Sequence, residues 1–170
     1  MSNELAAHYD PAGLEKIISQ QWAETKPFAA TPDENDKRYV IMMPLPNVTG
    51  ALHMGHAMDN VMQDMLTRWH RMMGDNALWM AGTDHAGIAT QALVEKKLSL
   101  ENISKNDIGR QKFIEKVWEW KKQYGDVIIN QLKKLGCSCD WSRNSFTMDK
   151  NLSKSVIKVF VELYKKKLIF

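Results

Sequence analysis

The sequence has no long hydrophobic run. No apolar stretch approaches the roughly 20 residues that a helix needs to cross a bilayer. Residues 1–10 also lack the basic and then apolar pattern of a secretory signal peptide. These absences argue against a membrane-spanning or exported protein. We therefore expect a cytoplasmic protein without a membrane partner.

Cysteine is scarce, and neither sign of charge dominates. The two cysteines, Cys137 and Cys139, are separated by one residue, so a disulfide between them would close no useful loop, and we expect free thiols. Lys and Arg number 23 against 20 Asp and Glu, for a net charge of +3, which is only a weak indication of polyanion binding.

The composition is that of an ordinary globular protein, with 44% hydrophobic and 25% charged residues. A length of 170 residues favours one domain with a core of its own. Apolar spacing predicts a leading helix over residues 10–24, with Asp10 as its cap and Pro11 in its first turn. Two prolines and several polar residues then predict a surface linker over 26–37, with a boundary near Asp36.

The central part of the sequence has the pattern of a βαβ unit. Residues 38–43 are short and apolar and are followed by prolines, which predicts a buried strand. Apolar residues recur at spacings of three and four over 51–73, which predicts a helix that ends at Gly74. A second apolar run at 77–81 predicts another strand. We therefore expect a parallel pair in an α/β fold.

The remaining pattern is mostly helical. We expect helices near residues 88–98, 106–124, 126–135 and 152–166 that cover one face of the sheet. The apolar residues 168–170 have no turn or cap after them, which suggests the start of a further strand.

Two histidines, His53 and His56, fall at the start of the helix predicted over 51–73. On a helical wheel they point away from the expected core. The stripe expected to face the core consists of Met58, Met62, Met65 and Trp69. The histidines instead share a face with Asn60, Asp64, Thr67 and Arg71.

A single histidine is more often structural than catalytic, but two histidines three residues apart in a first helical turn form a cluster of donors. The free N–H groups of that turn, the positive end of the helix dipole and the two imidazoles favour an anion at one place. Phosphate is the expected ligand. Because Gly55 has no side chain, the backbone between His53 and His56 would be accessible to a planar nucleotide base.

This segment resembles the HIGH signature of the class I aminoacyl-tRNA synthetases. The resemblance covers Pro46, Asn47, Val48, Thr49, Gly50, Ala51, Leu52, His53, Met54, Gly55 and His56. One departure is the order Pro44, Leu45, Pro46, where the family usually has three consecutive prolines.

Later segments resemble the valyl members of the family in particular. One is the amino-acid-pocket loop of residues 82–91, in which Thr83 stands where isoleucyl and leucyl relatives carry tryptophan. Residues 136–143 and 146–149 are also similar to valyl sequences. Residues 150–155 faintly resemble the KMSKS loop, the other ATP signature of the class, but they open a predicted helix, and we interpret them as part of its surface.

The resemblance implies a fold and a division of the chain. The expected fold class is α/β, the first half of a Rossmann-like, HIGH-type parallel-sheet catalytic domain with a helical insert and an N-terminal helix. Residues 1–36 would form the N-terminal helix and linker. Residues 37–170 would form the first half of the catalytic domain, ending before an editing insert.

The implied activity is that of a valine–tRNA ligase, which activates valine with ATP and transfers it to tRNA(Val). Magnesium would bridge the ATP phosphates, and no protein-bound metal is expected. His53 and His56 would be the catalytic donors to the triphosphate. The implied ATP-binding residues are Thr49, Gly50, His53, Met54, Gly55, His56 and Asn60. The implied valine-binding residues are Pro44, Pro46, Asn47, Thr83 and Asp84.

Activation needs no general base, because a carboxylate is already ionised at neutral pH. A pocket can discriminate valine from an amino acid that differs by one methylene group by only about 1–3 kcal/mol of binding free energy. The weak rejection of hydroxyl-bearing threonine by valyl enzymes is a standard example of this limit. An editing domain is therefore expected outside this chain. The full-length protein is expected to be a monomer.

Two other interpretations stay open at this stage. The chain could be a catalytically incomplete piece that binds ATP and valine weakly and must pair with a missing half. It could instead be a metal-dependent hydrolase with His53, His56, His85 and Asp84 as ligands, because two histidines three residues apart can share a metal.

Overall fold

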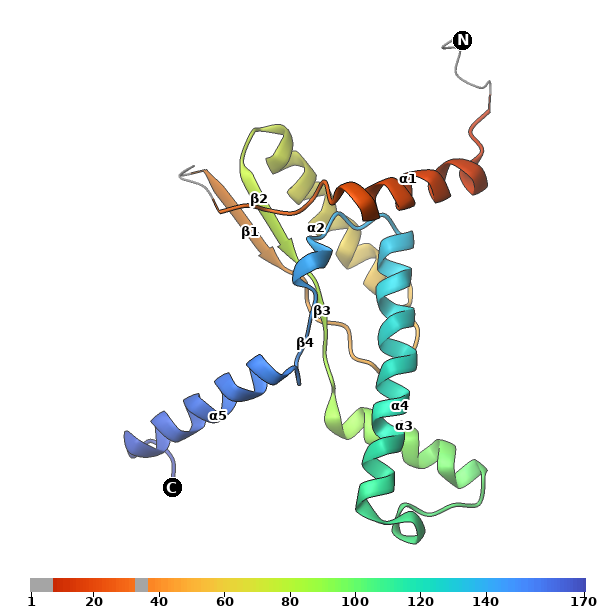
Figure 1. Cartoon of the computed structure of the whole chain (residues 1–170), viewed down its shortest axis with the longest axis vertical. Helices are drawn as coiled ribbons and strands as arrows, with labels where there is room; N and C mark the ends of the chain where they lie inside the picture. The colour runs from red at the N-terminus through yellow and green to blue at the C-terminus, as the bar shows by residue number, and fades with distance from the viewer. Residues whose placement is uncertain (1–7, 33–36) are drawn as a thin grey trace.

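The computed structural model describes residues 8–32 and 37–170. Its elements in chain order are α1 (Pro11–Thr25), β1 (Arg38–Met42), α2 (Met54–Met72), β2 (Asn76–Met80), β3 (Gly82–Thr83), α3 (Gly87–Leu100), α4 (Lys105–Lys134), the 3-10 helix η1 (Trp141–Arg143), β4 (Ser145–Phe146) and α5 (Lys150–Lys165). In Figure 1, β1 and β2 lie beside α2, and α5 projects away from the rest. Within the described ranges, no helix is both long and apolar enough to span a bilayer.

The predicted leading helix is confirmed as α1. The carboxylate of Asp10 accepts a hydrogen bond from the Ala12 backbone N–H at 3.1 Å, and Pro11 occupies the first turn. The helix ends at Thr25, and its C-cap residue Lys26 has a left-handed backbone conformation. The predicted boundary near Asp36 lies outside the described residues, so the division into 1–36 and 37–170 stays a prediction.

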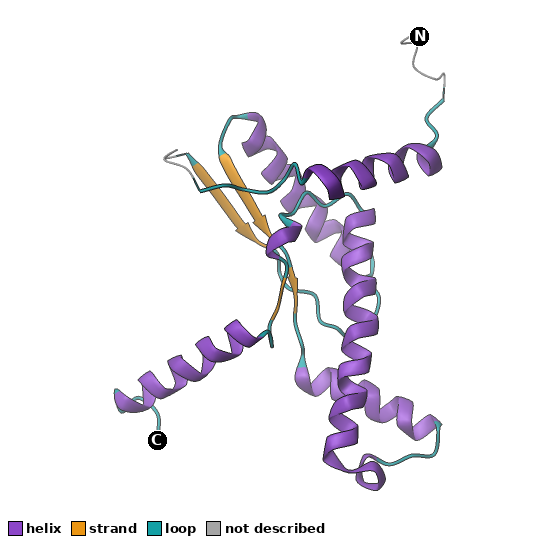
Figure 2. Ribbon diagram, in the orientation of Figure 1, coloured by secondary structure: helices purple, strands orange, loops and turns teal. Residues whose placement is uncertain are grey.

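The predicted parallel βαβ unit is confirmed. Strands β1 and β2 pair in parallel from Arg38 opposite Asn76 to Met42 opposite Met80, and α2 connects them. A second parallel pair, β3 with β4, was not predicted. Figure 2 shows these short strands continuing in the same direction from the ends of the longer pair.

The prediction that residues 38–43 form a buried strand is wrong in part. Strand β1 has the alternating pattern of a strand with one covered face, and Val40 and Met42 are 63% and 64% exposed. Helix α2 packs against β1, and the alternating burial shows that only one face of the strand is covered. Only Met43, just after the strand, is fully buried.

The predicted orientation of α2 is also wrong, and the helix starts at Met54 rather than at residue 51. The methionine-rich stripe faces outward, with Met58 69% and Met65 63% exposed. The polar face lies inside instead, where Asn60 and Thr67 are 1% and 0% exposed.

Hydrogen bonds to the segment that follows α4 explain this orientation. The Asp64 carboxylate accepts from the Ser138 backbone N–H at 2.8 Å and from its hydroxyl at 2.5 Å. Arg71 donates to the Ser138 carbonyl oxygen at 2.8 Å, and Arg68 donates to the Gly136 carbonyl at 2.8 Å. A buried backbone needs such partners, and only the polar face of α2 offers them.

The main core lies between β2, α4 and the chain before β4. Its buried residues are Met43, Val48, Trp79, Ala81, Ile128, Leu132, Cys137, Cys139 and Phe146. A smaller core joins α3 to α4 through Val94, Leu98 and Phe113.

The helices after β3 differ in detail from the prediction. The two helices expected over 106–124 and 126–135 are joined without a break at residue 125, and the break within α4 lies instead at Gly109, where a non-helical backbone separates a short first segment from the rest. Residues 150–155 open α5, as expected. The strand suggested at 168–170 is not formed, because a strand needs a hydrogen-bonding neighbour.

Candidate functional site

The loop from β1 to α2 lies along the end of β3. The Val48 backbone N–H donates to the Asp84 carbonyl at 3.0 Å, and the Asp84 N–H donates to the Pro46 carbonyl at 2.8 Å. These bonds form an isolated parallel bridge between Asn47 and Asp84. Two residues predicted to contact valine, 37 positions apart in the numbering, thus lie side by side.

Side chains of α4 hold the same loop from the other side. The Trp120 indole N–H donates to the Val48 carbonyl at 2.9 Å. The Gln131 side-chain oxygen accepts from the Leu52 N–H at 2.9 Å. The loop is therefore fixed at two points by one rigid helix.

The two predicted histidines form a reciprocal cap at the start of α2. His53 is the N-cap residue, and its Nδ1 accepts from the Gly55 N–H at 3.1 Å. Nδ1 of His56 accepts from the His53 N–H at 3.3 Å. An accepting Nδ1 carries no proton, so each neutral ring has its proton on Nε2. Each ring is therefore left with one N–H donor outside the cap.

Gly55 has a steric role in this cap. A Cβ on Gly55 would lie 2.9 Å from Cε1 and 3.1 Å from Nδ1 of His53. A side chain at position 55 would displace the His53 ring from the Gly55 N–H, which donates a hydrogen bond to His53 Nδ1.

The electrostatic surroundings keep His56 neutral. Partial burial lowers its pKa below the ordinary 6.5, the nearby His53 lowers it further, and Asp59 acts in the opposite direction. The ring centroids of His53 and His56 are 4.0 Å apart. At neutral pH, His56 is therefore a neutral donor rather than a cation.

A hollow of about 620 Å³ adjoins the cap. Its lining residues are Pro44, Leu45, Pro46, Asn47, Thr49, Gly50, Ala51, Leu52, His53, Gly55, His56 and Asp59. Most residues predicted for ATP and several predicted for valine are thus brought together. Sequence reasoning missed Asp59, although its position three residues after His56, one helical turn on, could have indicated it.

Four of the residues predicted to bind ATP or valine do not line this hollow, and neither does Val48 of the HIGH-like segment. Met54 is 82% exposed at the helix start. Asn60 is buried behind the first turn, where its amide donates to the His56 carbonyl at 2.7 Å and its side-chain oxygen has no partner. Thr83 is buried in β3, and Asp84 lies next to it.

Asp84 is instead part of a cluster with His85 and Thr147. The Thr147 hydroxyl donates to Asp84 Oδ1 at 3.0 Å. It also lies 2.6 Å from His85 Nδ1. Sequence reasoning gave Thr147 no role, because nothing in its local pattern indicates a partner more than 60 residues away. His85 lines a second hollow, of about 260 Å³, between α3 and α4.

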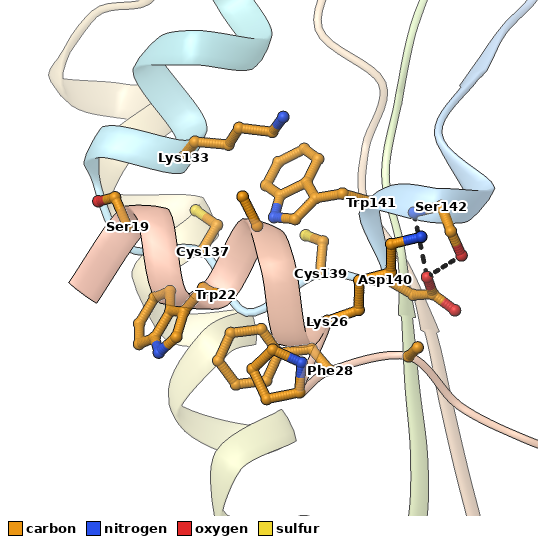
Figure 3. Close-up of a pocket in the computed structure, with 13 residues that line it drawn as sticks. Ser19, Trp22, Lys26, Phe28, Lys133, Cys137, Cys139, Asp140, Trp141 and Ser142 are labelled. Carbon is orange, nitrogen blue, oxygen red and sulfur yellow. Dashed lines mark hydrogen bonds between the residues drawn. The ribbon is translucent and has the colours of Figure 1, made fainter. Parts of the chain in front are cut away.

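A third hollow, of about 270 Å³, lies between α1 and the segment after α4 (Figure 3). Trp22, Phe28 and Trp141 contribute aromatic walls, and Cys137 and Cys139 line it as free thiols, as predicted. Burial raises the pKa of Cys137 to about 12 and raises that of Cys139 as well. Protonated thiols of this kind are poor nucleophiles and poor metal ligands.

The described residues offer no set of metal ligands. No group of three or more His, Cys, Asp or Glu side chains among them is close enough to hold an ion. His53 and His56, two of the ligands that the hydrolase interpretation requires, use Nδ1 in the cap, so only Nε2 of each ring is open to a ligand.

Comparisons with known proteins agree with these features. Residues 17–170 match the family described as tRNA synthetases class I (I, L, M and V). The chain is 62% identical over 170 residues to a valine–tRNA ligase of Pelagibacter ubique, covering 100% of this chain and 19% of that protein. It is 53% identical over 167 residues to a valine–tRNA ligase of Geobacter sulfurreducens, covering 98% and 19%.

A solved structure shares the fold. It is the crystal structure of the ternary complex of Agrobacterium radiobacter K84 agnB2 LeuRS, tRNA and LeuAMS, with a TM-score of 0.77 at 22% identity over 96% of this chain and 19% of that one. The likeness confirms the predicted fold class, an α/β, Rossmann-like arrangement with parallel strands. The chain spans about a fifth of the length of the relatives that it matches.

Proposed function

The chain belongs to the class I tRNA synthetases of the isoleucine, leucine, methionine and valine group, a family of ligases, and from this premise we propose that it supplies the HIGH half of a site that activates valine with ATP. The names of the similar proteins favour valine among the four amino acids. Valyl-adenylate would be the product of this step, and tRNA(Val) the acceptor in the next.

The scope of the proposal follows from length. The chain spans about a fifth of its relatives, so activation and transfer are proposed for a protein of the relatives' length. For these 170 residues alone we propose weak binding of ATP and valine without complete aminoacylation. The division at residue 36, a cytoplasmic location and a monomeric full-length protein belong to the same proposal.

The cap of His53 and His56 carries the proposal. Valine activation joins a carboxylate to the α-phosphorus of ATP and releases pyrophosphate. The carboxylate is ionised at neutral pH, so the site has to align the reactants and stabilise charge on phosphate oxygens. The cap leaves an Nε2–H donor on each ring, beside the hollow and at the positive end of α2.

The surrounding residues would contribute to ATP binding in different ways. Thr49, Gly50 and Gly55 line the hollow and would contact the nucleotide. Asn60 would act from behind by holding the His56 carbonyl, and Met54 would contribute through its place at the helix start. Magnesium would enter with ATP as part of the substrate, held by phosphate oxygens. We propose no metal bound by the protein itself.

The valine end would lie at the bridge between Asn47 and Asp84. The Asp84 carboxylate and the Asn47 side chain would bind the ammonium group, with Pro44 and Pro46 as walls. Buried Thr83 would support the loop from β3. The hydrogen bonds that join residues 46–48 to Asp84 support this placement.

The experiment is valine-dependent exchange of pyrophosphate into ATP, by the chain alone and by a protein extended to the relatives' length. In the extended protein, His56→Ala should lower the exchange rate roughly 10²- to 10³-fold, the usual cost of one charge-stabilising donor. The KM for valine should stay unchanged, because the lost donor acts on phosphate. His8→Ala, at an exposed histidine outside the site, is the matched control.

Exchange by His56→Ala at the parent rate would refute the role of the cap. A valine KM that rises together with the loss of rate would place His56 at the amino acid instead. Stoichiometric zinc or iron in the purified chain would favour the hydrolase interpretation. Magnesium-dependent ATP binding that responds to a valyl-adenylate analogue would favour the synthetase.

A further inference from the structure

The Thr147 hydroxyl connects two segments of the chain that the sequence keeps far apart. It accepts the His85 backbone N–H at 2.9 Å, lies 2.6 Å from His85 Nδ1 and donates to Asp84 Oδ1 at 3.0 Å. The Thr147 N–H also donates to the Thr83 carbonyl at 3.1 Å. These contacts exist because β4 pairs with β3 in a register that sets Phe146 opposite Thr83.

Counting protons determines the direction of each bond. A backbone N–H can only donate and a carboxylate can only accept, so the single hydroxyl proton of Thr147 goes to Asp84. The Thr147 oxygen then has no proton left for His85. The imidazole must therefore donate through Nδ1, which leaves Nε2 of the neutral ring as an acceptor.

The tautomer of His85 is thus opposite to that of the two histidines in the cap. His53 and His56 accept at Nδ1 and keep a donor at Nε2, which suits phosphate oxygens. His85 donates at Nδ1, and its free Nε2 suits a donor such as an ammonium group or an N–H. His85 Nδ1 also lies 3.3 Å from Asp84 Oδ1, so the proton-bearing side of the ring faces that carboxylate oxygen.

We infer that Thr147 is a positioning residue of the amino-acid pocket: its hydroxyl orients the Asp84 carboxylate and fixes His85 as the Nδ1–H tautomer. The consequence for valine rests on the proposed function, in which Asp84 binds the substrate ammonium. The carboxylate is partly exposed, with 37% of its side chain accessible, and its Oδ1 also accepts the Ala86 backbone N–H at the longer distance of 3.3 Å, so losing the Thr147 hydroxyl would leave it less firmly oriented. Holding it in advance lowers the cost of ordering it on binding.

The test compares Thr147→Val, which keeps the shape and removes the hydroxyl, with Thr147→Ser, which keeps the hydroxyl. The first readout is nitrogen-15 NMR of the His85 ring in the 170-residue chain. The parent and Thr147→Ser should show a protonated Nδ1. Thr147→Val should show the ring moving towards the Nε2–H form. A change in packing alone would not be rescued by serine.

The second readout is the Kd for valine, measured by NMR titration of the same chain. Thr147→Val should raise this Kd roughly tenfold, as expected for the loss of one hydrogen bond to a charged group, and Thr147→Ser should restore it. Thr67→Val is the matched control, because that buried threonine bonds only within α2. It should leave both the His85 tautomer and the Kd unchanged.

The outcomes separate this inference from the proposed function. An unchanged His85 tautomer in Thr147→Val would overturn the positioning role, whatever the Kd for valine. A changed tautomer with the parent's Kd for valine would overturn the link to the pocket. A changed tautomer in a chain whose parent form does not respond to valine would uphold the role of Thr147 and count against valine as the ligand.

Discussion

Gly82 offers a direct test of how closely the loops of the site are packed. A Cβ at Gly82 would lie 2.5 Å from the Ser145 carbonyl oxygen and 2.8 Å from Leu45 Cδ2. The first contact is with backbone, so Gly82→Ala must force β3 and β4 apart. Overpacking of this kind costs about 1–3 kcal/mol. Weakening the bond from Thr147 N–H to the Thr83 carbonyl adds about 1 kcal/mol.

We therefore expect Gly82→Ala to lower the free energy of unfolding by roughly 2–4 kcal/mol. Urea denaturation followed by circular dichroism measures this loss. Gly50→Ala is the matched control, because a Cβ at Gly50 meets nothing within 4 Å. Its effect should stay within about 0.5 kcal/mol. Equal stabilities for Gly82→Ala and the parent, or equal losses in the two variants, would refute the steric argument.

Three further expectations concern stability and ionisation. Trp120→Phe removes the indole donor to the Val48 carbonyl and should lower the free energy of unfolding by about 1–2 kcal/mol in the same denaturation assay. Cys137 and Cys139, whose pKa values are raised by burial, should resist a thiolate-specific reagent such as dithionitrobenzoate at pH near 8 until the chain unfolds. His56 should titrate in NMR with a pKa below 6.5. Its depressed folded-state pKa means that its contribution to stability is present above the ordinary pKa and is lost as the pH falls through the folded value.

Each expectation has a contrary result. If Trp120→Phe were as stable as the parent, the indole bond would contribute nothing to holding the loop. Labelling of Cys137 or Cys139 in the folded chain at the rate of a free cysteine would contradict their burial. A His56 pKa at or above 6.5 would contradict the desolvated, neutral ring on which the donor role depends.

The features that sequence reasoning predicted are those that depend on near neighbours. Helix α1 could be predicted because its cap, its proline and its apolar spacing all lie within fifteen or so residues. The pattern of strand, helix and strand around α2 is similarly local. The histidine cap uses atoms of residues 53–56 alone, so its motif is visible in a short stretch.

The orientation of α2 could not be predicted in this way. Periodicity separates an apolar from a polar face, and the usual expectation puts the apolar face inside. Here the inward face is set by Ser138 and Gly136, about 70 residues later, whose backbone groups require the side chains of Asp64 and Arg68. A helical wheel contains no information about such a partner.

Strand β4 and Thr147 were missed for a related reason. A strand of two residues has no periodicity to detect. The hydroxyl of Thr147 comes within hydrogen-bonding distance of its partners only when β4 pairs with β3. Phe146 is buried at that junction, but a single apolar residue in a polar stretch predicts no strand.

The two ends of the proposed site therefore depend on the fold to different degrees. The histidine cap closes within one helical turn and needs little beyond α2 itself. The Asp84 end needs β4 to be paired, because Thr147, the residue directly after that strand, is brought to Asp84 by the pairing. A perturbation that separates β3 from β4, such as Gly82→Ala, should thus release Asp84 and His85 while the bonds between His53 and His56 persist. Weakening of the fold would therefore reach the amino-acid end of the site before the phosphate end.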